Sequence, residues 1–217
     1  MRIDRGFHRV WTYVRGAPGT YVWLAILFVT TVAVHQMSPE FEAQFLRQRS
    51  TNIYELSNDP VRVLIASAMW IDSGHWPPYA VLYSVFHAPA ERWLGTARWL
   101  LVCVAAHVLG TLISEGALLL AVRHGVAPHS AVNTLDIGVS YALAGVIAVL
   151  TYRIAAPWRY PYLAVVLAVY GVPLATGRTF TDLGHFTSVL LGLACYPLVS
   201  GRGKAGNPKE TVAAPRG

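Results

Sequence analysis

The feature that most constrains this chain is a series of long apolar runs from which charged residues are nearly absent. A helix needs about 20 apolar residues to cross roughly 30 Å of hydrocarbon at about 1.5 Å per residue. Charged residues make up only 13% of the chain, whereas about 25% is usual in a soluble domain. The pattern therefore predicts an all-α membrane protein.

The apolar runs are spaced as six separate spans, with charged or turn-forming residues between them. The first run could be a signal peptide because four arginines precede it, but no A-x-A cleavage site follows and five further runs come later. A retained helix fits better. The six predicted spans are 20–37, 75–90, 97–122, 135–152, 160–176 and 180–199.

Lysine and arginine placement predicts the orientation of these spans, because basic residues are enriched in cytoplasmic segments. If both termini lie inside, all but five of the 17 lysines and arginines fall on the inner side. The sequence thus predicts an N-in, C-in protein of the cell membrane. The five basic residues predicted to lie outside are Arg47, Arg49, Arg62, Arg123 and Arg178.

The spans also define the domain organisation. Residues 1–19 are expected to form a cytoplasmic N-terminal segment, and 20–200 a single membrane domain. The connection 38–74 is long and semi-apolar, which favours a place at the outer interface with a short amphipathic helix. The tail 201–217 is rich in glycine, proline and charge, as disordered ends are.

Charge and cysteine content argue against several other classes of protein. The net charge is +6, but the basic residues flank apolar runs and form no dense patch, so we expect no nucleic-acid partner. Cys103 and Cys195 are too few for a disulfide framework. His87, His124 and His129 show no metal-ligand spacing. We therefore predict no metal and no cofactor.

Three polar residues inside or beside the spans are expected at a similar depth. In the predicted topology Ser140 lies roughly 5–9 Å below the outer boundary, His185 lies equally far from the outer start of its span, and His75 lies at an outer end. A serine hydroxyl is a weak nucleophile and needs a base within about 2.6–3.2 Å. A lone serine in a span is usually a packing residue, whereas a histidine there is a functional-site hypothesis.

Small residues predict that two of these spans pack closely. Gly184, Ser188 and Gly192 recur at four-residue spacing in one span, and Ser140, Ala144 and Ala148 do so in another. Such stripes let helix backbones approach one another. If the two stripes meet, His185 comes within reach of the Ser140 hydroxyl.

Four motifs over about 70–200 resemble those of the rhomboid family of intramembrane serine proteases. "GVSYALAG" is similar to its G-x-S-G-x-x-x-G motif, and "GHFTSVLLG" to its A/G-H-x-x-G-x-x-x-G motif. "HWPPY" sits where the family carries H-x-x-x-N, and "ERWLGTARWLLV" resembles its E-x-x-x-G segment. The 16-residue interval from His75 to Glu91 is also shared with the family.

The resemblance implies a fold and a set of roles. It implies a six-transmembrane-helix bundle that cleaves transmembrane substrates through a serine–histidine dyad. Ser140 and His185 would be catalytic. His75, Tyr79 and Gly138 would stabilise the oxyanion or contact the substrate, and Glu91, Gly95 and Gly192 would have structural roles.

Departures from the family motifs keep two other functions open. Tyr141 stands where these proteases usually have glycine, Tyr79 replaces the asparagine, and Ser188 replaces a glycine. These changes suit a catalytically inactive rhomboid-like protein that binds transmembrane clients. A small transporter with a proton path through His107 and Glu115 is a third possibility.

The other polar residues in or near the spans are expected to have structural roles. Asp182 suits a helix start better than a third catalytic residue, and Asp136 is read in the same way. Glu91 would accept hydrogen bonds from the following helix or from Arg98. His107 would bond to another helix, and Glu115 would pair with Arg123 or with a histidine.

Overall fold

The computed structural model describes residues 2–71 and 75–201, and within these the regular structure is entirely helical. The predicted tail 201–217 lies outside the described residues except for Gly201, as do residues 72–74 of the connection. The α-helices are α1 (Arg2–Arg15), α2 (Pro18–Val34), α3 (Pro39–Arg47), α4 (Ile53–Asn58), α5 (Pro60–Ser67), α6 (Trp76–Leu82), α7 (Ala88–Leu94), α8 (Thr96–Arg123), α9 (Val139–Val149), α10 (Arg159–Thr176), α11 (Phe180–Ala194) and α12 (Tyr196–Val199). The π-helix η2 (Tyr83–His87) joins α6 to α7, and the 3₁₀ helices are η3 (His129–Asn133) and η4 (Leu150–Tyr152).

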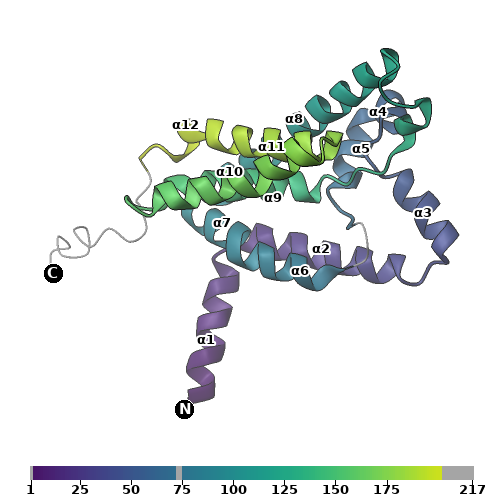
Figure 1. Cartoon of the computed structure of the whole chain (residues 1–217). Helices are drawn as coiled ribbons and strands as arrows, with labels where there is room; N and C mark the ends of the chain where they lie inside the picture. The colour runs from purple at the N-terminus through teal and green to yellow at the C-terminus, as the bar shows by residue number, and fades with distance from the viewer. Residues whose placement is uncertain (1, 72–74, 202–217) are drawn as a thin grey trace.

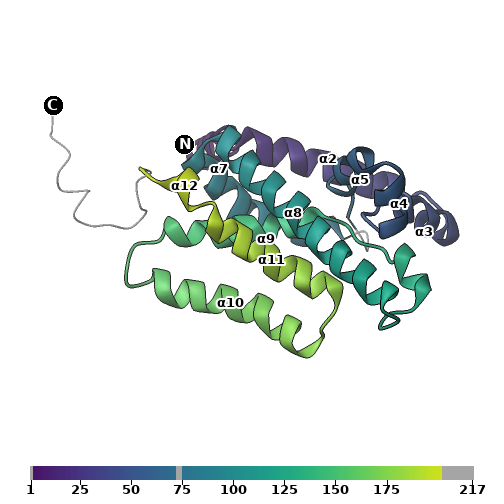
Figure 2. The ribbon, with the colours of Figure 1, turned by 90° about the horizontal axis from the view of Figure 1, so that it is seen from above.

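The long helices form a bundle centred on α8, α9 and α11, which pack against one another. Helix α10 lies at one edge of the bundle beside α11 (Figure 2). Helices α2, α6 and α7 form a second layer, and α1 projects away from the bundle (Figure 1). This architecture is consistent with the helical bundle that the sequence predicts.

The helix lengths in the structure support fewer membrane spans than the apolar runs of the sequence do. In the part of the chain that the structure describes, α8 is the one helix both long and apolar enough to cross a membrane by itself. Two shorter apolar helices cover Pro18–Val34 and Val139–Tyr152. The other predicted spans are shorter or less apolar as helices, so helix length alone does not establish six spans.

Two predicted spans have different bounds in the structure. The run 135–152 begins with an irregular stretch, and α9 starts only at Val139. The run 75–90 continues as helix through η2 to Leu94. The prediction stopped at the charged pair Glu91–Arg92, but the Glu91 carboxylate is buried by hydrogen bonds and does not end the helix.

The described part of the connection, residues 38–71, contains three short helices, whereas the sequence predicted one. Each begins after a residue whose side-chain oxygen accepts a backbone N–H, which are Ser38 for α3, Asn52 for α4 and Asp59 for α5. Such caps stabilise a helix start by about 1 kcal/mol. Proline follows the cap of both α3 and α5, where its missing N–H costs nothing.

Glycine allows α9 to approach its neighbours at the level of the backbone. A Cβ atom on Gly192 would collide with the backbone of Gly145, and one on Gly145 would collide with the Cβ of Ala106 on α8. The closest contact is therefore made by Gly145 rather than by the predicted Ser140, Ala144 and Ala148 stripe. The two alanines are fully buried beside Val189 of α11, in a separate cluster.

Candidate active site

Ser140 lies at the amino-terminal end of α9, which begins after Gly138. Its side chain is partly exposed, although most of α9 is buried. The first N–H groups of a helix have no acceptor within the helix, and they carry the positive end of the helix dipole. The Ser140 hydroxyl therefore lies beside backbone donors suited to a developing negative charge.

His185 lies in the second turn of α11, on a helix start that is fixed by a capping box. The Thr179 hydroxyl accepts the Asp182 N–H, while the Asp182 carboxylate accepts the Thr179 N–H at 3.1 Å and its hydroxyl at 2.7 Å. These reciprocal bonds set the first turn of the helix. The structure thus gives Asp182 the capping role that the sequence favoured.

The two helices bring Ser140 and His185 together. The Ser140 hydroxyl lies 2.8 Å from Nε2 of His185. The tautomer of His185 with its proton on Nδ1 would leave Nε2 as an acceptor for the serine proton. This is the geometry that a serine nucleophile and its base need.

Tyr141, which departs from the family motif, occupies the seam between α9 and α11. Its side chain is fully buried, and its ring meets the His185 ring edge-on at 4.8 Å and 74°. Gly184 makes room for it, since a Cβ atom there would lie 2.6 Å from the tyrosine ring. The bulky residue after Ser140 therefore packs against His185 from within the bundle.

Tyr170 provides a second aromatic neighbour for the imidazole. It comes from α10, and its ring centre lies 6.1 Å from that of His185 at an interplanar angle of 31°. The imidazole therefore has aromatic contacts from two helices besides its own. These contacts restrict the ring orientation that faces Ser140.

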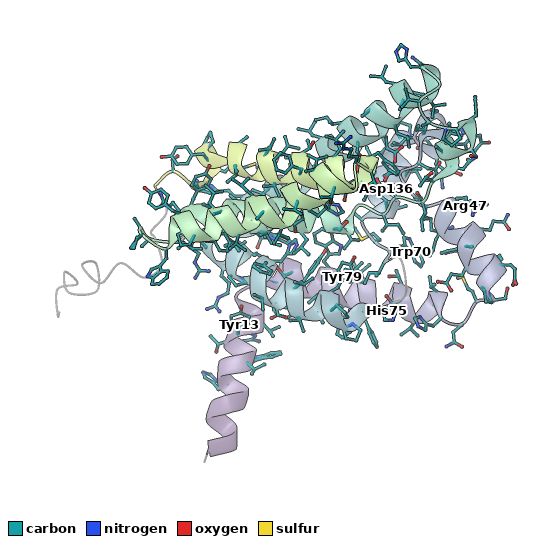
Figure 3. The ribbon with its side chains drawn as sticks, in the orientation of Figure 1. Tyr13, Arg47, Trp70, His75, Tyr79 and Asp136 are labelled. Carbon is teal, nitrogen blue, oxygen red and sulfur yellow. The ribbon has the colours of Figure 1, made fainter. Side chains whose placement is uncertain are left out.

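The structure does not join His75 to the dyad. His75 precedes α6 and is exposed, and among the described residues it makes no hydrogen bond to Ser140 or His185. Tyr79 is half-buried, packs on a core cluster and has its ring 6.4 Å from that of Tyr83. Figure 3 shows Tyr79 on α6 and His75 just before this helix, in the layer below the segment that carries Asp136.

Gly138 is buried against the ring of His107, and a side chain at this position would overlap that ring. Nε2 of His107 bonds to the Leu64 carbonyl at 2.8 Å, and the Ser67 hydroxyl lies 3.4 Å from the same atom. His107 thus links α8 to α5, and the contact fixes the start of α9. A packing role for Gly138 explains its position without contact to a substrate.

Glu91 bonds to α2 as well as to the start of α8. Its carboxylate accepts the N–H groups of Gly19 and Thr20 and the hydroxyls of Thr20 and Thr96, all at 2.7–2.9 Å. The sequence predicted Arg98 or the backbone of the next helix as the partner of Glu91. Of the partners observed, only the Thr96 hydroxyl belongs to that next helix, α8. Gly95, between α7 and α8, has a φ of 83°, which favours glycine.

Two expectations about buried acids are wrong. Asp136 does not cap α9. Its backbone and carboxylate instead bond to Ser50 and Thr51 of the connection between α3 and α4.

Both carboxylate oxygens of Glu115 are buried and have no partner among the described residues, so neither Arg123 nor a histidine pairs with it. The hydroxyl of Tyr141 lies near Asp136 and Ser114.

Among the described residues, no three histidine, cysteine, aspartate or glutamate side chains lie close enough together to hold a metal ion. The sequence singled out Tyr141 as a departure from the family motif but did not indicate that its ring packs against His185. A bulky residue after Ser140 and a glycine before His185 were the sequence features that could have indicated this contact. Tyr141 and Gly184 are 43 residues apart in the chain, however, and meet only because α9 packs against α11.

Comparison with known protein families finds a match over most of the chain. Residues 12–205 match a family model described as a rhomboid-like protein, which covers the whole bundle and the site. Neither the curated proteins nor the solved structures contain a match to this chain.

Proposed function

Because the chain belongs to the rhomboid-like protein family, we propose that it is an intramembrane serine protease. The observation that carries the proposal is the 2.8 Å contact between the Ser140 hydroxyl and Nε2 of His185. Sequence similarity alone cannot separate an active protease from an inactive relative. A serine and a histidine on different helices, in hydrogen-bonding geometry, provide the chemistry that activity requires.

The reaction follows from the positions of these two side chains. His185 takes the hydroxyl proton as the Ser140 oxygen attacks the scissile carbonyl, and the tetrahedral intermediate carries a negative oxygen. Collapse of the intermediate breaks the C–N bond, and His185 gives its proton to the leaving amine. Water then hydrolyses the acyl-enzyme by the same route and frees Ser140.

The oxyanion would be stabilised mainly by the amino-terminal end of α9. The Ser140 N–H is one of the helix-start donors without an intrahelical acceptor. Preorganised donors of this kind contribute roughly 10²–10³ in rate each. His75 and Tyr79 would add donors only if α6 moves relative to α9, since His75 is exposed and Tyr79 packs on the core cluster.

The membrane setting is part of the proposal. The chain would cross the cell membrane six times with both termini inside, which places Ser140 and His185 toward the outer face. A transmembrane helix that unwinds near the outer boundary would present its backbone to Ser140. The substrates would therefore be single-span or multi-span membrane proteins rather than soluble peptides.

Reconstituted cleavage tests this function. The full chain would be placed in proteoliposomes with a tagged single-span protein whose outer boundary contains helix-destabilising residues. We expect cleavage near that boundary, and a loss of more than about 10³-fold in Ser140→Ala and in His185→Ala. Equal cleavage by wild type and Ser140→Ala would contradict the proposal.

A second candidate is a client-binding protein without catalysis. It is favoured by the separation of His75 from the dyad and by the tyrosine in place of an asparagine at position 79. Co-purification of a tagged single-span protein distinguishes the two. Binding without cleavage, unchanged in Ser140→Ala and His185→Ala, would support this alternative.

A further inference from the structure

A small pocket opens between α10 and α11, directly beside the imidazole of His185. Its volume is about 190 Å³, and Ser140 does not line it. The lining residues come from the edge helix α10 and from α11, which run side by side (Figure 2). Pockets for whole small molecules are usually about 300–1,000 Å³, so this one suits a single side chain. Its lining residues are Val169, Tyr170, Pro173, Asp182 and His185.

Two of the lining residues offer an acceptor, the backbone carbonyl of Val169 and the carboxylate of Asp182. Pro173 lies inside α10 and has no N–H, so the Val169 carbonyl loses the helical donor it would otherwise have. The Asp182 carboxylate caps α11 through one oxygen. It forms no ion pair with a lysine or arginine of the described residues. The wall therefore carries one carboxylate that is not paired with a cation of the described residues.

The remaining wall suits the rest of a basic side chain. Val169 and Pro173 offer apolar surface along which the methylene stem of lysine or arginine can lie. The ring of Tyr170 can receive a cation on its face, an interaction of about 0.5–2 kcal/mol. An apolar side chain would fill the same space but would leave the negative charge of Asp182 without a cationic partner.

The place of the pocket relative to the dyad identifies the substrate position it would serve. His185 returns its proton to the leaving amine, so the leaving fragment lies on the imidazole side of Ser140. A pocket lined by His185 and not by Ser140 thus adjoins the first residue of the leaving fragment. We propose that this pocket binds a lysine or arginine side chain immediately after the scissile bond, and that Asp182 selects it. This specificity rests on the proposed protease function.

Sequencing of cleaved bonds tests the specificity. The full chain would be reconstituted with a library of single-span proteins whose outer boundary segment is randomised, and products would be identified by mass spectrometry. Lysine and arginine should be enriched about tenfold over leucine at the first position of the leaving fragment. Asp182→Asn should remove most of this enrichment, because the amide keeps the shape and loses the charge.

A matched pair of variants separates the pocket from general effects on the fold. Val169→Phe fills the pocket and should also remove the preference for basic residues. Val165→Phe adds the same bulk one helical turn earlier, at a position that is equally exposed (60% against 58% for Val169) but does not line the pocket, and should keep the preference. Labelling of Ser140 by a fluorophosphonate would verify that each variant is folded.

The outcomes distinguish the two proposals. Cleavage with no preference for basic residues, or with a preference that survives both Asp182→Asn and Val169→Phe, overturns the specificity and leaves the protease function standing. Absence of both cleavage and Ser140 labelling in the wild type overturns the protease function and the specificity together.

Discussion

Helices α9 and α10 both contact the His185 side of the bundle, yet their environments differ. In α9 nearly every residue is buried, and Gly145 lies against the backbone of α11. In α10 only Val166 is buried. Gly171 of α10 meets nothing closer than the Phe186 ring at 3.5 Å from an added Cβ atom. The proposed nucleophile is thus on a tightly packed helix, and the proposed substrate pocket is bordered by a loosely packed one.

This difference assigns separate tasks to the two helices. Ser140 must keep its position relative to His185 within a fraction of an ångström, and close packing of α9 provides that rigidity. The pocket must admit a side chain, and an edge helix with few buried contacts can adjust. Substitutions in α9 should therefore affect folding first, and substitutions in α10 should affect substrate choice first.

The largest predicted contrast is between the two tyrosines that contact His185. Tyr141→Ala removes a fully buried ring and should lower the free energy of unfolding by about 3–5 kcal/mol. Tyr170→Ala removes a half-buried ring and should cost about 1 kcal/mol. Denaturation in detergent micelles measures both. Equal costs would refute the proposed difference between α9 and α10.

Two glycine substitutions give a second contrast, because they should change the free energy of unfolding in opposite directions. Gly192→Ala forces a methyl group into the Gly145 backbone and should destabilise the protein by about 2–3 kcal/mol. Gly171→Ala places the same methyl group in ordinary contact within a helix, where alanine is favoured by up to about 1 kcal/mol. Thermal unfolding of the two purified variants would reveal the contrast. A Gly192→Ala variant as stable as the wild type would show that α9 and α11 do not pack as closely at Gly145 as the structure indicates.

The smallest effect is expected from the tyrosine hydroxyls. The Tyr141 hydroxyl is buried without a well-formed hydrogen bond among the described residues, so Tyr141→Phe should change stability by less than about 1 kcal/mol. Because the ring rather than the hydroxyl supports His185, cleavage activity should also be retained. A large loss of activity in this variant would give the hydroxyl a role that its surroundings do not indicate.

The sequence predicted the local features and missed those that depend on packing. The apolar runs predicted most of the long helices, and the motifs around Ser140 and His185 identified residues that lie together in the structure. Whether Tyr141 would cover Ser140 could not be predicted, because the answer depends on Gly184 of another helix. Asp136 was read as a helix cap because nothing local indicated Ser50 and Thr51 as its partners.

The central claim is that Ser140 is a nucleophile activated by His185. Treatment of the full chain in detergent with a fluorophosphonate, followed by peptide mapping, tests it most directly. We predict one covalent adduct, located on Ser140, that forms more than about 10²-fold more slowly in His185→Ala. No adduct on Ser140, or an equal labelling rate in His185→Ala, would contradict the claim.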